Sequence, residues 1–559
     1  MKFGELAKYL QKLEGTASRN EMTVILAKLF GEASPEDARL IAYLSAGRLG
    51  PAYNSPDTGV ADKMMVKALG PEAEKLFKQK GDMGLVAQEL NTGKGSLSVE
   101  EVHERLLSIA RDSGTGSQER KQELIRKLLS ELDAVSAKYV VKIILGKLRT
   151  GFSDMTVLDS LSWMLAGDKS KRKEIEKIYN VRADLGEVAK TIKTYRTNRT
   201  HRTYGPEVGT PILMARAERA KTPQDIWERN GKCAVEYKLD GLRIQAHLKG
   251  GIVTLFSRGM EDVTHMYPDI CEGLTKQLKN NCIVEGEMIA VGSNGRFLPF
   301  QETVQRKRKY DIAAMAMKVP LKIYLFDVLL LNRTNMTNRT NKERREALEE
   351  LVKPGEVVKL MPRIEIETEI EIEKYFKEAV GDGTEGIIAK KLDGPYQAGA
   401  RDFNWIKYKK SYTKSALADT IDAVVMGYDV GQGKRASFGI GDFLIGVYES
   451  DLDSFVTVAK VGTGLTDQEW REMKLKCQMS NVKSKPENYN VKKEMNCDHW
   501  VGPKIVVEIL ADEITKSPMH TSGYALRFPR LVTFREKKPQ DATTVQELLN
   551  MFKLQQESR

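Results

Sequence analysis

A lysine followed by an acidic-glycine pair and an arginine stands in the run Val235 to Arg243, VEYKLDGLR. Side chains alternate along a strand, so Glu236 and Lys238 share one face of a predicted strand. Asp240-Gly241 predicts a two-residue hairpin turn, which would place Lys238 opposite Arg243 with Cβ atoms roughly 5 Å apart. A nearby cation and partial desolvation both favour the neutral amine, so the run predicts a lysine nucleophile. For this motif alone, an ordinary hairpin with a surface lysine stays an alternative.

Further candidate residues follow downstream in short predicted strands. Arg258 comes directly after a strand predicted over 252–257, and Phe326 lies in a long apolar run over 321–331. Taken singly, each has a simple structural explanation such as a buried strand or an edge lysine. The other candidates are Glu285 and Glu287 on a strand over 283–290, Glu385 at the start of a run ending at Lys390, and Lys407 and Lys409 on one face of a strand over 405–410.

As an ordered set, these motifs resemble the covalent nucleotidyltransferase superfamily, specifically ATP-dependent DNA ligases of the archaeal and eukaryotic replicative type. The resemblance covers nearly the whole chain. It implies an enzyme that seals nicks in duplex DNA through a lysyl-AMP intermediate and an adenylated 5′-phosphate. Replication, repair and recombination are the settings that it implies.

The resemblance also implies roles for the residues that bind the nucleotide. Lys238 would attack the α-phosphate of ATP, and Glu236 would recognise the edge of adenine. Phe326 would stack on the base, a contact worth about 1–3 kcal/mol. Arg243 and Arg258 would hold the ribose and a phosphate.

Acidic and basic residues of the later motifs are implied to hold a metal and the phosphates. Glu287 would lie near the ribose and a metal; Glu285 shares its face, so this choice rests on the resemblance. Glu385 would help to place a divalent cation. Mg²⁺ suits such a site, because phosphate oxygens and water complete its octahedron. The cations implied to hold phosphates and the leaving pyrophosphate are Arg401, Lys407 and Lys409.

Composition limits the class of protein. The chain has 559 residues, 41% of them hydrophobic, and a net charge of +11, which together favour several domains and a polyanionic partner. We find no uninterrupted apolar run of membrane-spanning length, and the first five residues do not resemble a signal peptide. The five cysteines have no C-x-x-C spacing. We therefore expect a cytoplasmic protein, associated with the nucleoid if the source is prokaryotic.

Three domains are predicted, making a multidomain fold. Residues 1–193 show helical periodicity and resemble the all-α DNA-binding domain of these ligases. Residues 194–416 form an α+β nucleotidyltransferase (adenylation) domain, which begins with a linker over 194–204. Residues 417–559 contain short apolar strands separated by glycines, which predict a small all-β barrel, and this region resembles the OB-fold domain of the ligases.

The helical domain contains an internal echo, DMGLVA at 82–87 and DLGEVA at 184–189. Chance is one explanation. The other is a duplicated helical unit whose two helix N-termini could hold DNA phosphates. A helix is also predicted over 137–148, followed by a basic segment. By resemblance, this domain would bind nicked duplex without sequence preference.

Several charged or polar segments receive weaker predictions. The run at 306–309 is expected to be a solvated charge cluster, and the Asn/Thr-rich segment 332–342 a polar loop of unknown role. Near the C-terminus the match to the family's last motif is loose, so four residues stay open as the pyrophosphate-orienting group: Arg527, Arg530, Arg535 and Lys537.

Three rival functions share part of this pattern. An mRNA-capping guanylyltransferase lacks a long helical N-terminal part, and an NAD-dependent ligase carries a cysteine-rich zinc module. A non-catalytic DNA-binding scaffold would have lost motif residues. We expect a monomer. A sliding clamp is a further possible partner by family, but segment 93–98 lacks the aromatic residues of a clamp motif.

Overall fold

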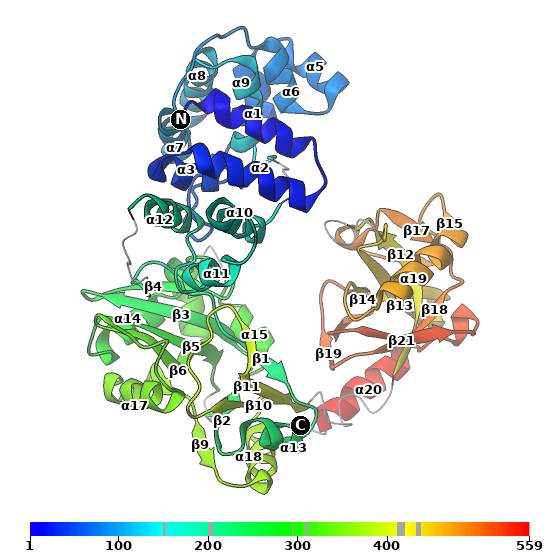
Figure 1. The fold of residues 1–559 in the computed structure, drawn as a ribbon. Coiled ribbons are helices and arrows are strands. Elements are labelled where there is room, and N and C mark those ends of the chain that lie inside the picture. Colours follow the sequence, from blue (N-terminus) through cyan, green and yellow to red (C-terminus); the bar gives the residue numbers. More distant parts are fainter. Residues whose placement is uncertain are drawn as a thin grey trace. The chain divides into compact units, whose positions relative to one another are not determined.

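The computed structural model describes residues 1–148, 152–198, 205–292, 295–307, 311–410, 420–431 and 438–557 (Figure 1). The chain divides into two compact units. The first comprises Met1–Glu218, Lys232–Glu365 and Ala389–Ile406, and the second comprises Arg219–Gly231, Ile366–Ile388 and Lys407–Arg559. Within the described residues, no helix is both long and apolar enough to cross a membrane.

The N-terminal part is helical, as predicted. Capping residues mark where several of these helices begin. Ser98 and Glu101 form a reciprocal capping box at the start of α7. Ser34 caps α3, and Pro35 follows it at the first helical position. The helices are α1 (Phe3–Glu14), α2 (Arg19–Glu32), α3 (Pro35–Ser45), α4 (Asp62–Leu69), α5 (Ala73–Lys80), α6 (Met83–Leu90), α7 (Val99–Arg111), α8 (Ser117–Ser130), α9 (Ala134–Ile144), α10 (Asp154–Ala166), α11 (Arg172–Val181) and α12 (Leu185–Asn198).

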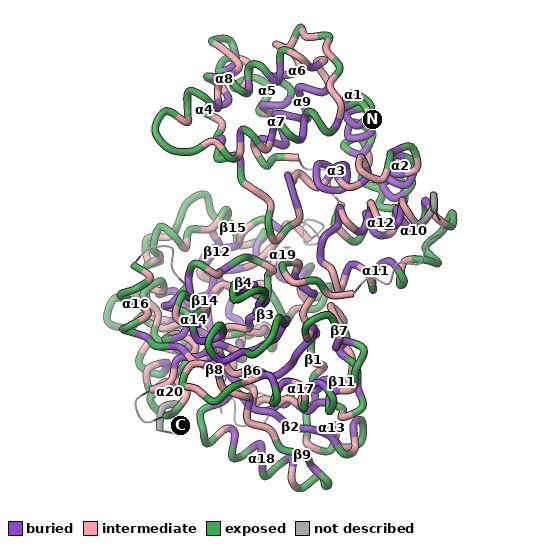
Figure 2. The backbone as a smooth tube through the Cα atoms, turned by 90° about the vertical axis from the view of Figure 1, so that its left-hand side faces the viewer, coloured by how far each residue is buried: buried purple, intermediate pink, exposed green. Residues whose placement is uncertain are grey.

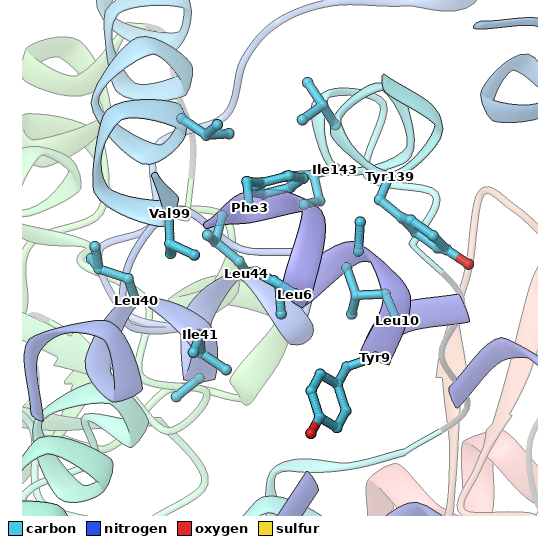
Figure 3. Close-up of a cluster of buried hydrophobic side chains, with 14 of the residues drawn as sticks. Phe3, Leu6, Tyr9, Leu10, Leu40, Ile41, Leu44, Val99, Tyr139 and Ile143 are labelled. Atoms are coloured by element: carbon cyan, nitrogen blue, oxygen red, sulfur yellow. The ribbon is translucent and has the colours of Figure 1, made fainter. Parts of the chain in front are cut away.

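The core of this helical domain forms around α3 and α9, which are buried along most of their length (Figure 2). Apolar residues at three- and four-residue spacing on α1 pack towards them. Figure 3 shows these side chains meeting: Phe3, Leu6, Tyr9 and Leu10 of α1, Leu40, Ile41 and Leu44 of α3, Val99 of α7, and Tyr139 and Ile143 of α9. Burial of this apolar surface is what stabilises the domain.

The predicted duplication is supported by two equivalent helix pairs. Asp82 caps α6 by accepting a hydrogen bond from Leu85 N at 3.0 Å, and Asp184 accepts one from Glu187 N at 3.0 Å at the start of α12. Lys142 of α9 pairs with Asp82 at 2.9 Å, in the same way as the Tyr43 hydroxyl of α3 donates to Asp184 at 2.5 Å.

Close approach explains the glycine of each echo. A Cβ on Gly84 would lie 2.8 Å from Lys142, and one on Gly186 would lie 2.3 Å from the Tyr43 ring. Each N-terminus is thus packed on another helix, and its own aspartate accepts a hydrogen bond from a backbone N–H of the first turn. That these two N-termini hold DNA phosphates stays a prediction.

Two further boundaries differ from the predictions. The helix predicted over 137–148 ends at Ile144, because Gly146 takes a positive φ of 62° that reverses the chain. The predicted linker begins with helix, since α12 continues to Asn198. Residues 149–151 and 199–204 lie outside the described residues.

The central part contains a mainly antiparallel sheet of order β4-β3-β5-β6-β7, with β8 parallel to β6. Its inner side chains form one apolar core with helix α14. Its strands are β3 (Leu242–Lys249), β4 (Ile252–Ser257), β5 (Cys282–Ala290), β6 (Leu321–Leu331), β7 (Thr334–Asn335) and β8 (Val358–Leu360), and the helices of this region are α14 (Pro268–Gln277), α15 (Phe300–Val304), α16 (Ile312–Lys318) and α17 (Asn341–Leu351).

A second sheet has the order β1-β11-β10-β2-β9. β2 belongs to this sheet whereas β3 belongs to the first, so Asp240-Gly241 joins two sheets and does not close a hairpin. Its strands are β1 (Arg216–Arg219), β2 (Cys233–Lys238), β9 (Arg363–Ile366), β10 (Gly386–Lys391) and β11 (Arg401–Lys409), and the flanking helices are α13 (Pro223–Asn230) and α18 (Glu369–Gly381).

Two charged segments of the central part are less simple than predicted. Arg306 is not solvated: its side chain is buried and pairs with Asp269 at 2.7 Å. The polar segment 332–342 turns at Asn332 and leads into α17, whose buried Arg344 binds Asp327 with two hydrogen bonds of 2.7 and 3.0 Å. That bidentate pair fixes the residue next to Phe326.

The described residues of the C-terminal part form mainly strands, as predicted, together with two α-helices. Its largest sheet has the order β15-β17-β12-β13-β14-β16, with β18 joining β12 to β21. The strands are β12 (Ile421–Asp429), β13 (Asp442–Glu449), β14 (Ser454–Val461), β15 (Asn481–Val482), β16 (Tyr489–Asn490), β17 (His499–Val501), β18 (Val506–Leu510), β19 (Glu513–Lys516), β20 (Tyr524–Arg527) and β21 (Arg530–Arg535), and the helices are α19 (Asp467–Met479) and α20 (Val545–Glu557).

Candidate active site

Strand β2 carries the two central candidates, Glu236 and Lys238, on the same side. The strand is apolar and buried up to its last residue, where Lys238 is half-buried. Glu236 is 2% exposed. A buried carboxylate needs cations or donors, because desolvation otherwise favours its neutral form. Those partners come from two other strands, β9 and β10.

The link from β2 to β3 explains the glycine of the lysine motif. Neither Asp240 nor Gly241 has a positive φ, which a primed two-residue turn requires. Instead, a Cβ on Gly241 would lie 2.3 Å from the carbonyl oxygen of Met288 on β5. The glycine is therefore needed for close approach of the link to β5, not for a turn.

Arg243 is engaged by a buried carboxylate on the neighbouring strand. Its Nη2 pairs with Glu285 Oε2 at 2.7 Å, and its Nη1 donates to Ala215 O at 2.7 Å. Gln245 donates to the other oxygen of Glu285 at 3.1 Å. Burial opposes the charge of Arg243, but Glu285 outweighs it and raises the pKa of the guanidinium. Glu285 thus pairs with Arg243 and is buried, and Glu287 is half-buried.

The strand register places three candidates at one level of the first sheet. Arg243 on β3 faces Glu287 on β5. Ile244 pairs with Ser257 on the antiparallel strand β4. The next residue after Ser257, Arg258, therefore lies beside Arg243, just beyond the last paired residues. Its side chain is exposed. A register shift between Glu285 and Gly286 leaves Phe326 as an extra residue on β6.

A buried group that we call the Glu236 cluster consists of Glu236, Phe326, Arg363, Lys390 and Trp405. Lys390 Nζ pairs with Glu236 Oε2 at 2.6 Å and donates to Phe326 O at 3.2 Å. The same Nζ lies 4.6 Å from the centroid of the Phe326 ring and 4.3 Å from that of Trp405. The two rings meet edge to face with centroids 5.9 Å apart.

The two carboxylate oxygens of Glu236 differ in their hydrogen-bond partners. Oε1 is buried and has no hydrogen-bond partner in the part of the chain that the structure describes. Its nearest ion-pair neighbour is Arg363 Nη1, at 3.8 Å. A buried carboxylate oxygen in this state can accept a hydrogen bond from a ligand that enters beside Phe326.

The acidic and basic candidates of β10 and β11 are arranged as follows. Glu385 pairs with Lys409 at 3.0 Å, and each is partly buried. Lys407 is half-buried on the same face of β11 as Lys409, between buried apolar residues. Arg401 begins β11 and is exposed. Across the described residues, no group of three or more His, Cys, Asp or Glu could hold a metal by itself.

All four open candidates of the C-terminal motif take part in ion pairs within their own domain. Arg527 pairs with Glu513 at 3.6 Å, and Arg530 with Asp512. Arg535 pairs with Glu508 at 3.1 Å, and Lys537 with Asp422 at 2.6 Å. These contacts do not single out one of them.

Comparison with known proteins decides the family. Residues 2–162 match the family described as DNA ligase N terminus, residues 214–409 match the ATP dependent DNA ligase domain, and residues 436–538 match the ATP dependent DNA ligase C terminal region. A probable DNA ligase of Dictyoglomus turgidum is 44% identical over 100% of this chain and 99% of its own. The chain belongs to the ATP-dependent DNA ligase family.

Other relatives agree with this ligase assignment. A DNA ligase of Sulfolobus acidocaldarius is 38% identical over 99% of this chain and 98% of its own. A solved structure titled Pmar-Lig_PreS3 aligns with 95% of this chain at a TM-score of 0.54 and 17% identity, a likeness of fold alone. The reaction of this family is the sealing of nicks in duplex DNA with ATP and Mg²⁺. The predicted order of a helical, an adenylation and a β-rich OB-fold domain is confirmed.

Sequence reasoning missed three members of the Glu236 cluster in the ligase: Arg363, Lys390 and Trp405. Lys390 could have been noticed as a cation that ends an otherwise apolar run over 386–389. Arg363 gives no such signal, because its partner Glu236 is far away in sequence. The contacts exist only after the two sheets are formed.

Proposed function

We propose that Lys238 is the nucleophile of this ligase and becomes a lysyl-AMP. The observation that carries this assignment is the buried Glu236 carboxylate, two residues earlier on β2, whose Oε1 lacks a hydrogen-bond partner among the described residues. Adenine presents an amino donor, which such an oxygen accepts. If Glu236 binds the adenine, the α-phosphate of the same nucleotide would lie within reach of Lys238, two residues further along β2.

The remaining nucleotide contacts follow from the same arrangement. Phe326 would stack on the base, and Arg243 and Arg258 would hold the ribose and a phosphate. Arg243 is already oriented by Glu285, so little rotamer freedom is lost when it binds. This pre-organisation favours Arg243 as a fixed contact to the nucleotide.

Glu287 and Glu385 are the residues that we propose for Mg²⁺. Both are carboxylates with partial exposure, which fits a hard cation that keeps water and phosphate ligands. When bound, the metal stabilises negative charge on phosphoryl oxygens. Arg401, Lys407 and Lys409 would bind the phosphates and the leaving pyrophosphate, because oriented cations stabilise the charge of phosphoryl transfer.

Three displacements complete the reaction. The neutral amine of Lys238 attacks the α-phosphorus of ATP, a P–N bond forms, and pyrophosphate leaves. An oxygen of the 5′-phosphate at the nick then attacks the same phosphorus, which releases the amine and adenylates the DNA. Finally, the 3′-hydroxyl attacks the 5′-phosphorus, a phosphodiester forms, and AMP leaves. Positioning and charge stabilisation supply most of the acceleration.

The finer organisation of the ligase is also proposed. The helical domain would span residues 1–193, the adenylation domain 194–416, and the OB-fold domain 417–559. The protein would act as a cytoplasmic monomer, on the nucleoid in a prokaryote, and would contact nicked DNA through phosphates. A sliding clamp is not proposed for segment 93–98. Gly93 and Gly95 there approach backbone carbonyls of Leu132 and Glu131 so closely that a Cβ would lie 2.3 and 2.1 Å away.

The experiment is self-adenylation with labelled ATP, GTP or NAD, followed by sealing of a nicked duplex. We expect label from ATP alone, retained after denaturation and discharged on nicked DNA. Lys238→Ala should lose the adduct completely, because no other amine replaces it. Lys232→Ala, an exposed lysine just before β2, is the matched control and should label normally. A covalent AMP adduct on the Lys238→Ala protein would refute the assignment.

A further inference from the structure

Lys390 is an unusual residue for the interior of a protein. It lies near the end of β10 with a side chain that is 1% exposed. A buried ammonium group is costly unless charge and hydrogen bonds compensate it. The roles proposed for the nucleophile and for the phosphate-binding cations do not involve Lys390, so a buried lysine at this position needs another explanation.

Lys390 contacts both Glu236 and Phe326, the two residues proposed to bind the base. Its Nζ forms an ion pair with Glu236 Oε2 at 2.6 Å and donates a hydrogen bond to the carbonyl oxygen of Phe326 at 3.2 Å. The ammonium also lies 4.6 Å from the centre of the Phe326 ring, within cation–π range. One side chain therefore fixes a carboxylate on β2 relative to an aromatic ring on β6.

The two oxygens of Glu236 are left in different states by this contact. Oε2 is saturated by Lys390, while Oε1 has no hydrogen-bond partner within the described part of the chain. Arg363 at 3.8 Å adds positive charge on the Oε1 side without a hydrogen bond. Oε1 is therefore the oxygen of Glu236 that remains available to accept a hydrogen bond from a ligand.

We propose that Lys390 is a positioning residue that gives this ligase its preference for ATP over GTP. The inference rests on the proposed contact of Glu236 and Phe326 with the base. Adenine offers an amino group to an ionised carboxylate, whereas guanine offers a carbonyl oxygen at the same ring position. An ionised acceptor held rigidly in place repels that carbonyl, which discriminates against GTP.

Removing the ammonium should weaken that discrimination. Without Lys390, Oε2 of the buried Glu236 loses its hydrogen-bonded partner, and the carboxyl group can rotate. A carboxyl group that is no longer held in place can turn its oxygen away from the guanine carbonyl, so GTP is repelled less. The loss should therefore appear in base selectivity and nucleotide affinity, and much less in the maximal rate of lysine adenylation.

Single-turnover self-adenylation of the full-length protein tests this. The variants are Lys390→Met, the conservative Lys390→Arg, and the matched control Lys391→Met, whose lysine is exposed on the next position of β10. Labelled ATP and GTP are each titrated, giving a dissociation constant and a maximal rate for each nucleotide. For Lys390→Met we expect the ATP dissociation constant to rise about tenfold or more and the ATP/GTP preference to fall by a similar factor, which is the effect of losing roughly one charge-assisted contact.

Two other results complete the expectation. Lys391→Met should match the parent protein, and Lys390→Arg should recover part of the preference. If Lys390→Met keeps the parental ATP/GTP preference, the proposal is overturned, whatever happens to the rate. If that variant does not fold by circular dichroism, Lys390→Gln is measured in its place, and an unchanged preference there overturns the proposal equally.

Glu236→Gln separates this inference from the proposed function. If Glu236→Gln lowers the ATP/GTP preference and Lys390→Met does not, only the role of Lys390 fails. If Glu236→Gln leaves the preference unchanged, the assignment of Glu236 as the base reader fails, and the role of Lys390 fails with it. In the double variant, we expect no further loss beyond Glu236→Gln, because Lys390 acts through that carboxylate.

Discussion

The glycine at position 241 was predicted to be necessary, but for the wrong structural reason. The Asp-Gly pair predicted a tight hairpin, yet the two strands that it joins belong to different sheets. What the position requires is the absence of a Cβ, since the carbonyl oxygen of Met288 lies where that atom would be. Local sequence cannot reveal this requirement, because β5 is some forty residues downstream.

Gly241→Ala follows from that contact. The added methyl group must push the link away from β5, which should destabilise the protein by about 1–3 kcal/mol and displace Lys238. We expect a lowered melting temperature together with a self-adenylation rate reduced at least about tenfold, since small misplacements of a nucleophile are costly.

Gly381→Ala is the matched control for this variant. Gly381 ends α18, a Cβ there would meet nothing within 4 Å, and its φ is not positive. This substitution should be neutral or slightly stabilising. Equal behaviour of the two variants in both measurements would contradict the proposed reason for the glycine at 241.

At the scale of elements, the helices and strands themselves were predicted well, because periodicity and caps are local signals. The apolar runs at 283–290 and 321–331 became β5 and β6, and both aspartates of the internal echo became helix caps. What could not be predicted was which elements meet. Arg306 lies in a segment predicted to be a solvated charge cluster, and Lys390 lies at the end of a predicted strand. Their ion-pair partners, Asp269 and Glu236, come from distant parts of the sequence.

Helix α1 is joined to α9 by one carboxylate, which gives a prediction with a pH dependence. Glu14 accepts hydrogen bonds from Lys138, Lys142 and Tyr139 at 2.5, 2.5 and 2.8 Å. Burial raises the pKa of Glu14, but these donors outweigh it and lower the pKa to about 2, from an ordinary 4.5. The lysines are nearly buried, so they depend on this partner.

Glu14→Gln should therefore destabilise the protein at neutral pH, by roughly 1–3 kcal/mol because charged donors lose their partner. A lowered folded-state pKa stabilises above the unfolded value, and this contribution disappears as pH falls from about 4.5 towards 2. Urea unfolding at several pH values should show the parent and the variant converging over that interval. Glu74→Gln, an exposed carboxylate on α5, should show little difference at any pH, and a constant gap for Glu14→Gln would refute the argument.

For the whole molecule, the net charge of +11 and the DNA substrate make ionic strength the informative variable. Binding to DNA releases counterions, so the logarithm of affinity should fall linearly with the logarithm of salt concentration, with a slope of about −0.9 per phosphate contact. We expect a steep slope for nicked and intact duplex alike, with tighter binding of the nicked form. Titrations by fluorescence anisotropy measure both; a flat salt response would contradict phosphate-based binding.

The central claim is that one amine, that of Lys238, carries AMP between ATP and the nick. The most direct test is peptide mapping of the full-length protein after incubation with ATP and Mg²⁺ and no DNA. We expect a single AMP adduct, on the peptide that contains Lys238, which disappears when nicked duplex is added and sealed. An adduct on another residue, or sealing by the Lys238→Ala protein with ATP, would contradict it.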